Sequence, residues 1–290
     1  MRSTVIAILA AMLLLGVVAT LSAQDEEEPT YGWTKDVVGN LNFTQTSFSN
    51  WEQGGEDSWN WQLDINGKFV NDQEKTNWTT TGKVSYGRTK IGDADDRKLA
   101  DEINLESVFT YKMSVYVNPY VAVSGLTQIT EGFDYEADPT GETAISEFMN
   151  PGFFTESVGF GYEPFANFKT RAGLAFKQTV VTDTAYSLRY HVIDEDTGEL
   201  KKVRNEVGME SVTDYSRKLN DIMSYTTKLK AFTDFESVES IDVDWDNMIS
   251  AKVAKYISVS FNFKLFYDND ISAKRQLKQV LAAGLTYTFL

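Results

Sequence analysis

Hydrophobic and polar residues alternate with a period of two along most of the last fifty residues of the chain. The alternation is clearest in the string YISVSFNFKLFY at residues 256–267, and it recurs in residues 241–253 and 277–289. Because successive side chains of a strand point to opposite faces, this period predicts β-strands. We interpret the apolar face as facing lipid and the polar, partly charged face as lining a lumen.

The same alternation predicts twelve strands in the whole chain, each about as long as the ~9–11 residues that a tilted strand needs to cross a membrane. The expected strands cover residues 35–48, 58–71, 77–91, 101–113, 116–130, 153–162, 167–178, 203–212, 221–233, 241–253, 256–267 and 277–289. The strand at residues 203–212 has the weakest pattern. The expected fold class is therefore all-β: a transmembrane, antiparallel, up-and-down barrel of about 12 strands.

The connections between these strands alternate in length. Short ones, such as residues 113–116 and 163–167, alternate with long ones, such as residues 131–152 and 179–202. Bacterial outer-membrane barrels have this layout, with short periplasmic turns and long outer loops. The alternative is a soluble β-sandwich with the aromatic residues in its core, and such a fold has no reason to sort its loops by length.

Two of the long connections carry turn signals at their centres. Residues 186–192 keep the parity of the preceding strand, and DEDTGEL at residues 194–200 is a turn signal. We therefore expect the strands to continue past the membrane as a protruding hairpin, with its tip near Thr197 and Gly198. The string ADPTGET at residues 137–143 predicts a similar tip above the fifth and sixth strands.

Aromatic and large apolar residues near the strand ends predict two interfacial girdles. The expected outer girdle contains Trp59, Trp61, Phe154 and Tyr267, and the expected periplasmic girdle contains Phe168, Ile257, Tyr287 and Phe289.

The beginning of the chain predicts export. A charged start, an apolar run at residues 5–18 and the small residues Ser22 and Ala23 follow one another in the order of a secretory signal peptide. A transmembrane anchor is the alternative, but the run is shorter than the ~20 residues of a spanning helix. We expect a signal peptide at residues 1–23, a short acidic disordered tail at 24–34 and the barrel at 35–290. The expected location is the bacterial outer membrane after Sec-type export.

Composition narrows the classes of function. The formal net charge is −15, which argues against binding nucleic acid, and the chain contains no cysteine for disulfides or thiol chemistry. A single histidine, His191, no GxSxG string and no His/Cys cluster predict that the protein is not an enzyme, has no catalytic residues and takes no metal or cofactor. The expected partners are outer-membrane lipid and lipopolysaccharide and the barrel-assembly machinery, and we expect a monomer.

Charged residues on the polar face are the candidate functional site. The main cluster joins three neighbouring strands and consists of Lys228, Lys230, Asp242, Asp244, Asp246 and Lys264. One interpretation is a set of cross-strand ion pairs that brace the lumen. The other is a basic track for an anionic solute. Twelve strands place the lumen between the filled eight-stranded and the open sixteen-stranded barrels, so any channel is narrow.

The most distinctive string is the first expected hairpin, FTQTSFSNWEQGGEDSWNW at residues 43–61. Its candidate residues are Trp51, Gly54, Gly55 and Trp59, where the glycine pair permits a tight turn. The hairpin either packs on itself or forms an aromatic contact for a ligand at the mouth.

Together with the expected signal peptide and strands, the part TSFSNWEQGGEDSW resembles an uncharacterised family of outer-membrane β-barrels from Bacteroidota. The resemblance covers the chain from about Trp33 and implies no ligand and no catalytic residue. Such barrels commonly end on an aromatic residue that the assembly machinery reads, whereas here Phe289 is penultimate and Leu290 is last.

These patterns predict a porin-like barrel. The first hypothesis is a narrow pore or binding barrel for small polar solutes, anionic ones among them. The alternative is a closed structural or adhesive barrel whose outer loops bind a partner or a component of the cell envelope.

Overall fold

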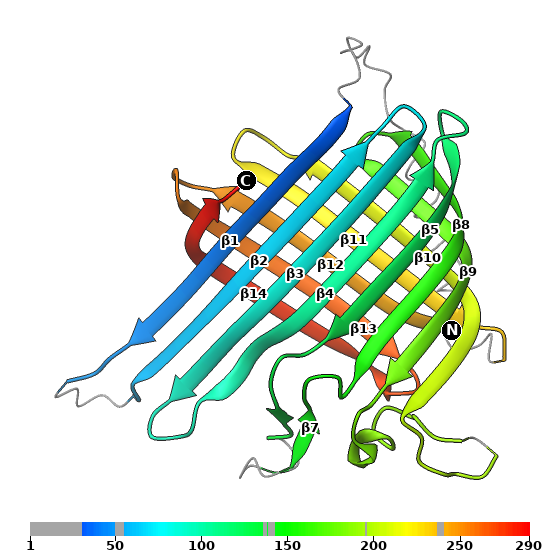
Figure 1. Ribbon diagram of the computed structural model, residues 1–290. Helices are drawn as coiled ribbons and strands as arrows, with labels where there is room; N and C mark the ends of the chain where they lie inside the picture. Colours follow the sequence, from blue (N-terminus) through cyan, green and yellow to red (C-terminus); the bar gives the residue numbers. More distant parts are fainter. Residues whose placement is uncertain (1–30, 50–54, 136–137, 139–142, 195, 237–240) are drawn as a thin grey trace. The chain divides into compact units, whose positions relative to one another are not determined.

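The computed structural model describes residues 31–49, 55–135, 138, 143–194, 196–236 and 241–290. Twelve antiparallel strands form a closed barrel in the order β1-β14-β13-β12-β11-β10-β9-β8-β5-β4-β3-β2 (Figure 1). Their bounds are β1 Gly32–Thr46, β2 Ser58–Asp72, β3 Thr76–Ile91, β4 Arg97–Tyr111, β5 Val117–Thr127, β8 Gly152–Phe165, β9 Phe168–Val180, β10 Val203–Lys218, β11 Met223–Asp234, β12 Ile241–Lys252, β13 Ile257–Asp268 and β14 Ser272–Thr288. The short strands β6 (Gly132–Phe133) and β7 (Ala144–Ser146) pair in the β5–β8 connection, and a 3₁₀ turn, η1 (Thr184–Tyr186), lies between β9 and β10.

The strand number, direction and order confirm the predicted barrel. The largest differences lie at strand ends: β14 begins at Ser272 instead of residue 277, and β10 runs to Lys218 instead of residue 212. The β10 strand, which has the weakest sequence pattern, pairs along its length with β9. The expected signal peptide and most of the acidic tail lie outside the described residues.

The outer surface of the barrel wall is apolar. Val121, Phe160 and Leu281 remain 58%, 63% and 75% exposed although they are large hydrophobic residues. In water such exposure would be costly, whereas a lipid-facing wall requires it. Among the described residues, no helix is long and apolar enough to cross a membrane.

Two tryptophans on this outer surface have their indole N–H groups bonded to the neighbouring strand. Nε1 of Trp78 donates to Oγ of Ser107 at 2.8 Å, and Nε1 of Trp245 donates to Oγ1 of Thr227 at 2.9 Å. A polar group in contact with hydrocarbon needs an internal partner, so these bonds suit a wall that faces lipid.

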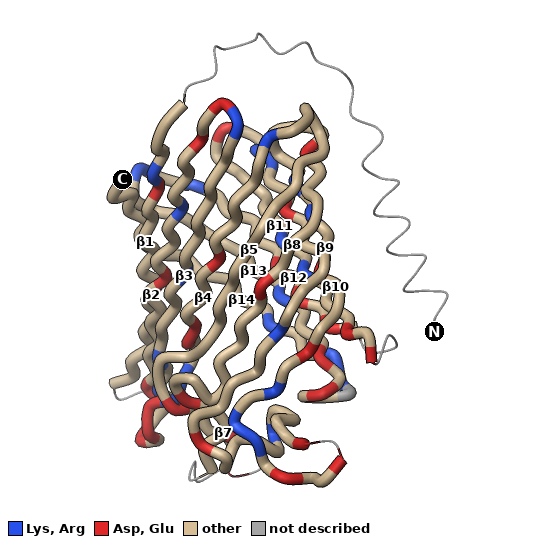
Figure 2. Tube along the Cα trace, turned by 45° about the vertical axis from the view of Figure 1, so that its right-hand side comes forward, with Lys and Arg blue, Asp and Glu red and all other residues tan. Residues whose placement is uncertain are grey.

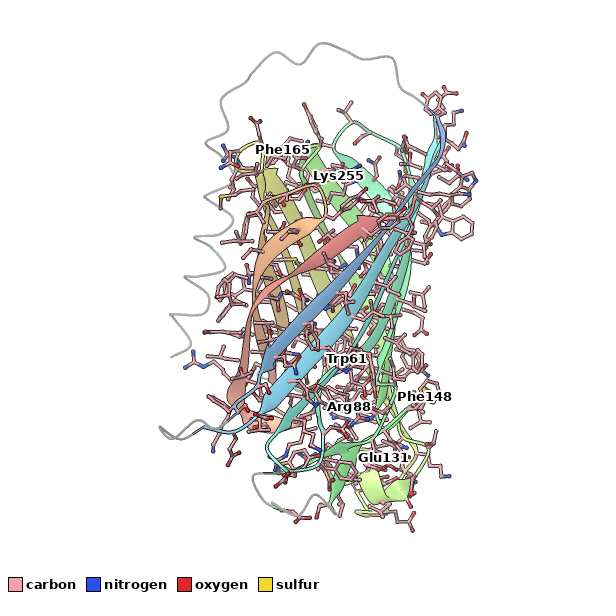
Figure 3. The ribbon with its side chains drawn as sticks, turned by 90° about the vertical axis from the view of Figure 1, so that its left-hand side faces the viewer. Trp61, Arg88, Glu131, Phe148, Phe165 and Lys255 are labelled. Atoms are coloured by element: carbon pink, nitrogen blue, oxygen red, sulfur yellow. The ribbon has the colours of Figure 1, made fainter. Side chains whose placement is uncertain are left out.

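Short and long connections are sorted to opposite ends of the barrel. In Figure 3, Phe165 and Lys255 of two short turns lie at the upper end, whereas Glu131 and Phe148 of the β5–β8 connection lie at the lower end. We call the end with short turns the periplasmic end and the other the outer end. Tyr287 stands at the periplasmic end, with its ring centroid 6.4 Å from that of Tyr256 and 5.0 Å from that of Phe289.

At the outer end, the β5–β8 and β9–β10 connections pack on each other. Asn150 is fully buried; its Nδ2 donates to Oγ1 of Thr182 at 2.8 Å, and its Oδ1 accepts the N–H groups of Thr182 at 2.6 Å and Asp183 at 3.1 Å. The hydroxyl of Tyr190 donates to the carbonyl of Ile145 at 2.7 Å, and burial raises the pKa of this hydroxyl. We call these packed connections the outer cap.

The predicted protruding hairpin is only partly correct. Its tip lies where expected, with a bridge between Ile193 and Leu200. However, the segment before the tip forms η1 and a series of turns instead of a continuous strand. The reason is local packing: Val181, Tyr190 and Val192 form a small buried cluster, which an extended hairpin could not assemble. Most of the ADPTGET string lies outside the described residues.

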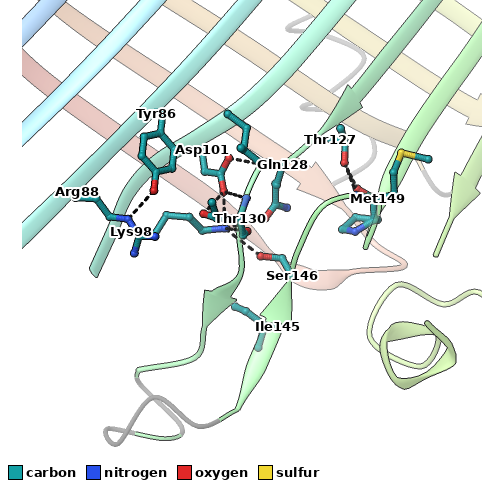
Figure 4. A network of polar contacts seen from close by, with 12 residues as sticks. Tyr86, Arg88, Lys98, Asp101, Thr127, Gln128, Thr130, Ile145, Ser146 and Met149 are labelled. Atoms are coloured by element: carbon teal, nitrogen blue, oxygen red, sulfur yellow. Dashed lines mark hydrogen bonds and ion pairs between the residues drawn. The ribbon is translucent and has the colours of Figure 1, made fainter. Parts of the chain in front are cut away.

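The outer cap reaches two further parts of the rim. Ile271, between β13 and β14, packs against the buried cluster of the β9–β10 connection, and Arg204 of β10 pairs with Asp270 at 2.6 Å. On the other side, Lys98 of β4 contacts Asp101, Gln128 and Ser146, as Figure 4 shows. Connections far apart in sequence therefore bind one another above the barrel.

Candidate functional site in the barrel lumen

The alternation of the strands turns the charged residues of the predicted cluster toward the lumen. The register places Lys228 opposite Asp246, Lys230 opposite Asp244, and Asp246 opposite Lys264, as neighbours across adjacent strands. These six residues nevertheless do not form one group. Their closest charged contacts divide them among three groups, two of which reach across the lumen.

The first group is centred on Glu106 of β4, which is only 7% exposed. Its carboxylate accepts from Lys228 at 2.5 Å and from Arg171 at 2.8 Å, and Lys230 lies 3.5 Å away. Lys228 and Lys230 belong to β11. Around the barrel, four strands lie between β11 and β4 in one direction and six in the other. Arg171 also lies 3.8 Å from Glu210. Side chains from nearly opposite walls thus meet and narrow the lumen at this level.

The second group is centred on Lys177 of β9, near the outer end of the barrel. Its Nζ lies 2.6 Å from Asp242, 3.5 Å from Glu206 and 3.6 Å from Asp268. Asp268 belongs to β13, and three strands, β10, β11 and β12, lie between it and β9. Lys177 and Asp268 are both buried, so this group occupies the part of the lumen beside β9–β13, directly below the outer cap.

The third group contains the adjacent-strand contacts that the sequence predicts. Lys264 pairs with Asp244 at 3.1 Å, and Asp246 accepts from Nδ2 of Asn262 at 2.5 Å. All three lysines of the predicted cluster are therefore paired with carboxylates. This arrangement fits bracing ion pairs better than an unpaired basic track.

The opposite part of the lumen carries many uncharged polar side chains, with the charged residues Asp64, Lys68 and Lys278 among them. We call this surface the neutral wall; its residues are Asn40, Asn42, Asn60, Gln62 and Asn66 of β1 and β2, Ser258, Ser260 and Asn262 of β13, and Thr286 of β14. All nine are partly exposed. Some bond with each other, as Thr286 does with Oδ1 of Asn40 at 2.7 Å. Amides and hydroxyls both donate and accept hydrogen bonds, so this wall can exchange partners with a polar solute.

The charged side of the lumen is more tightly closed. The inward residues Tyr120, Ala122, Ser157 and Ala175 of β5, β8 and β9 are all buried. Glycines permit a close approach here: a Cβ at Gly159 would lie 2.1 Å from the carbonyl oxygen of Ala172. Free space for a solute is therefore expected along the neutral wall.

The predicted first-hairpin site is described only in part. Trp51 and Gly54 lie outside the described residues. Gly55 has a φ of 129°, and a Cβ there would lie 2.6 Å from the Phe48 ring, so this position requires glycine. Trp59 belongs to β2 and pairs with Gln45 of β1.

Sequence reasoning missed several carboxylates of the lumen, among them Glu206, Glu210, Asp268 and Asp270. Glu206 and Glu210 belong to β10, where Val203, Val207 and Met209 face outward and the two glutamates face inward. This alternation is the only sequence signal that places the two glutamates in the lumen. Asp268 and Asp270 lie at a strand end, where alternation no longer assigns a face. In the described residues, no group of three or more His, Cys, Asp or Glu side chains is placed to hold a metal ion. Figure 2 shows several further acidic stretches at the end with the long connections.

A closed antiparallel barrel of twelve strands, with an apolar exterior and a charged and polar lumen, defines a barrel of the outer-membrane type. Residues 43–133 match a family described as "Protein of unknown function (DUF3078)". This part includes the string TSFSNWEQGGEDSW. No curated protein matches the sequence significantly.

The chain is also similar in structure to solved outer-membrane barrels. An outer-membrane channel from Pseudomonas putida F1 matches with a TM-score of 0.40 and 11% identity, over 93% of this chain and 99% of that one. The NanC porin matches with a TM-score of 0.39 and 6% identity, over 86% and 98%. The translocator domain of the autotransporter NalP from Neisseria meningitidis matches with a TM-score of 0.35 and 10% identity, over 99% and 98%.

Proposed function

We propose that the protein is an outer-membrane barrel that lets small polar solutes pass along the neutral wall of its lumen. The division of the lumen is the observation that carries this proposal. Charged residues of β4 and β9–β13 are paired, several of them across the lumen, whereas the amides and hydroxyls of β1, β2, β13 and β14 remain partly exposed. A passage beside paired charges is narrow and rich in neutral donors and acceptors.

The same division narrows the class of solute. A path for anions needs cations whose charge is available, but three lysines of the charged side of the lumen, Lys177, Lys228 and Lys264, are paired with carboxylates. We therefore favour small neutral solutes with hydroxyl or amide groups over anions. The proposal includes no catalytic step, cofactor or metal.

The proposal includes the route to the membrane. Residues 1–23 act as a signal peptide for Sec-type export and are removed, and the assembly machinery then inserts the barrel into the outer membrane as a monomer. The apolar exterior and the sorting of short turns to one end support this placement. The family match over residues 43–133 supports the proposal that the chain belongs to the uncharacterised Bacteroidota barrels that its first hairpin resembles.

Swelling of proteoliposomes in isosmotic solutions of neutral sugars tests the passage. We expect swelling with a pentose, a slower rate with a hexose, and little with a disaccharide. Empty liposomes treated with the same detergent are the control. Equal and negligible rates for all three sugars, from a protein that is folded and inserted, would contradict the proposal.

The outer cap favours the second candidate, a closed barrel whose outer surface binds a component of the envelope. Its packed contacts, such as Tyr190 with Ile145, reduce access from outside. The swelling experiment separates the two functions, because a closed barrel inserts equally well and passes no sugar.

A further inference from the structure

The seam between the first and last strands of the barrel is paired over only part of its length. The pairs of β1 with β14 run from Val38 opposite Thr288 to Asn42 opposite Gly284. By contrast, β1 pairs with β2 along its full length, from Gly32 to Thr46. Toward the outer end, residues 43–46 of β1 and residues 272–283 of β14 form no pair with each other among the described residues. We call this stretch the open seam.

The open seam lies at the level of the lipid-facing surface. On β14, the outward side chains Leu277, Leu281 and Leu285 are 61%, 75% and 58% exposed, and residues 280–283 lie between them. Tyr287 marks the periplasmic interface just below. The span from Leu277 to Leu285 is about 26 Å of strand at ~3.3 Å per residue, comparable to the ~25 Å apolar band of such barrels. Figure 3 shows β1 and β14 on the side that faces the viewer.

Unpaired strand edges are costly at this level. Each backbone N–H or C=O group without a partner in hydrocarbon costs several kcal/mol, and closed barrels normally have no such edge. Residues 43–46 are all exposed, including Thr44, which points inward. Side chains of this stretch are thus exposed on both faces of the wall, Thr44 toward the lumen and Phe43 toward lipid.

The lumen side of the open seam differs from the rest of the lumen. The inward positions of β14 next to it are Val280 and Ala282, with Gly284 at the start of the paired part. Lys278, two residues nearer the outer end of β14, also faces the lumen. The side-chain amides of Gln45 and Gln279 flank the seam on the lipid-facing side. Apolar surface therefore continues from the exterior into the lumen, with polar groups beside it.

We propose that the open seam is a lateral opening, through which the acyl chain of an amphipathic molecule reaches the lumen from the outer leaflet. The apolar chain lies against Val280 and Ala282, and its polar head is held near the neutral wall. The outer cap restricts access from above, so the seam offers a second route. This inference rests on the bilayer placement proposed above, but not on conduction of polar solutes.

Quenching of a fluorophore by brominated acyl chains tests the opening. Because the chain contains no cysteine, single sites can be labelled with bimane. Ala282→Cys is the test site, and Val280→Cys is a second inward site in case the first variant folds poorly. Leu281→Cys faces lipid and serves as the positive control. Asn104→Cys on β4 faces the lumen in a wall paired on both sides, with Lys83 and with Leu126, and serves as the negative control.

In vesicles of phosphatidylcholine with brominated chains, we expect quenching at Ala282→Cys of at least roughly half that at Leu281→Cys, and little at Asn104→Cys. Quenching at Leu281→Cys alone would overturn the lateral opening and leave the proposed pore intact. Absence of quenching at Leu281→Cys as well would overturn the bilayer placement and with it both proposals.

A second arm distinguishes the source of the chain. In unbrominated vesicles, 11-bromoundecanoate is titrated against the Ala282→Cys and Asn104→Cys labels. Saturable quenching at Ala282→Cys, reversed by unbrominated undecanoate, identifies a site for free single-chain amphiphiles. Quenching only by the brominated phospholipid assigns the opening to bilayer lipid. Quenching of both labels to the same extent would contradict a site at the seam.

Discussion

Replacing Glu106 by glutamine removes the negative charge at the centre of the lumen while keeping the shape of the side chain. In the native protein this carboxylate is 7% exposed and contacts three cations, Arg171, Lys228 and Lys230. Glu106→Gln leaves these cations next to a neutral amide. We therefore expect both lower stability and a local excess of positive charge in the lumen.

The magnitude follows from burial. Removing one partner of a buried ion pair costs about 3–5 kcal/mol. The side chains of Lys228 and Lys230 keep 30% and 26% exposure, so lumen water solvates them in part. We expect the lower end of the range, a loss of about 3 kcal/mol in the free energy of unfolding. In a planar bilayer, the reversal potential in a salt gradient should also shift toward anion preference.

Urea unfolding in lipid vesicles, followed by the gel shift between folded and unfolded barrel, measures the loss of stability. Glu163→Gln is the matched control, because its ion pair with Lys169 joins the ends of β8 and β9 beside their short turn, with the two side chains 43% and 53% exposed. That pair should contribute less than about 1 kcal/mol. An equally small effect for Glu106→Gln, with no change in ion preference, would refute the account of a charge group that spans the lumen.

Three further substitutions test other parts of the structure. Asn150→Ala removes the side chain that ties two outer connections together, and we expect roughly tenfold faster trypsin cleavage in the β9–β10 connection, as for a loss of about 1.4 kcal/mol in local stability; an unchanged rate would contradict the packed outer cap. Ser107→Ala leaves the indole N–H of Trp78 without its partner and should cost about 1 kcal/mol in urea unfolding, whereas adding Trp78→Phe should recover much of it. Gly173→Val places a Cβ only 2.2 Å from the carbonyl oxygen of Val158, so no folded band should appear on the gel; a normal band would show that the two strands can separate there.

Strand alternation predicts much of this fold because each strand of a barrel has one lipid-facing and one lumen-facing side. This is why all twelve strands, their order and the inward direction of residues such as Lys228 and Asp246 follow from the sequence. Alternation fails where the chain stops being extended. The segment that includes Tyr190 keeps a period of two but folds into turns, because its side chains pack on the neighbouring connection.

The partners of the lumen charges could not be predicted in the same way. Sequence places Lys230 beside Asp244 on adjacent strands, and the register confirms that neighbourhood. Lysine and arginine side chains are long enough to cross a narrow lumen, however, so Lys230 approaches Glu106 on a distant strand instead. Such contacts depend on the diameter and stagger of the closed barrel. The extent of the open seam also depends on the diameter and stagger of the barrel, since no local pattern in β1 or β14 indicates where the pairing of these two strands ends.

The passage of small polar solutes is the central claim, and single-channel current of the refolded protein in a planar bilayer tests it most directly. The account predicts a small, steady conductance that neutral sugars reduce as they occupy the neutral wall. It also predicts only weak ion preference, which Glu106→Gln moves toward anions. A folded and inserted protein that passes no current, with or without the substitution, would contradict the account and favour the closed barrel.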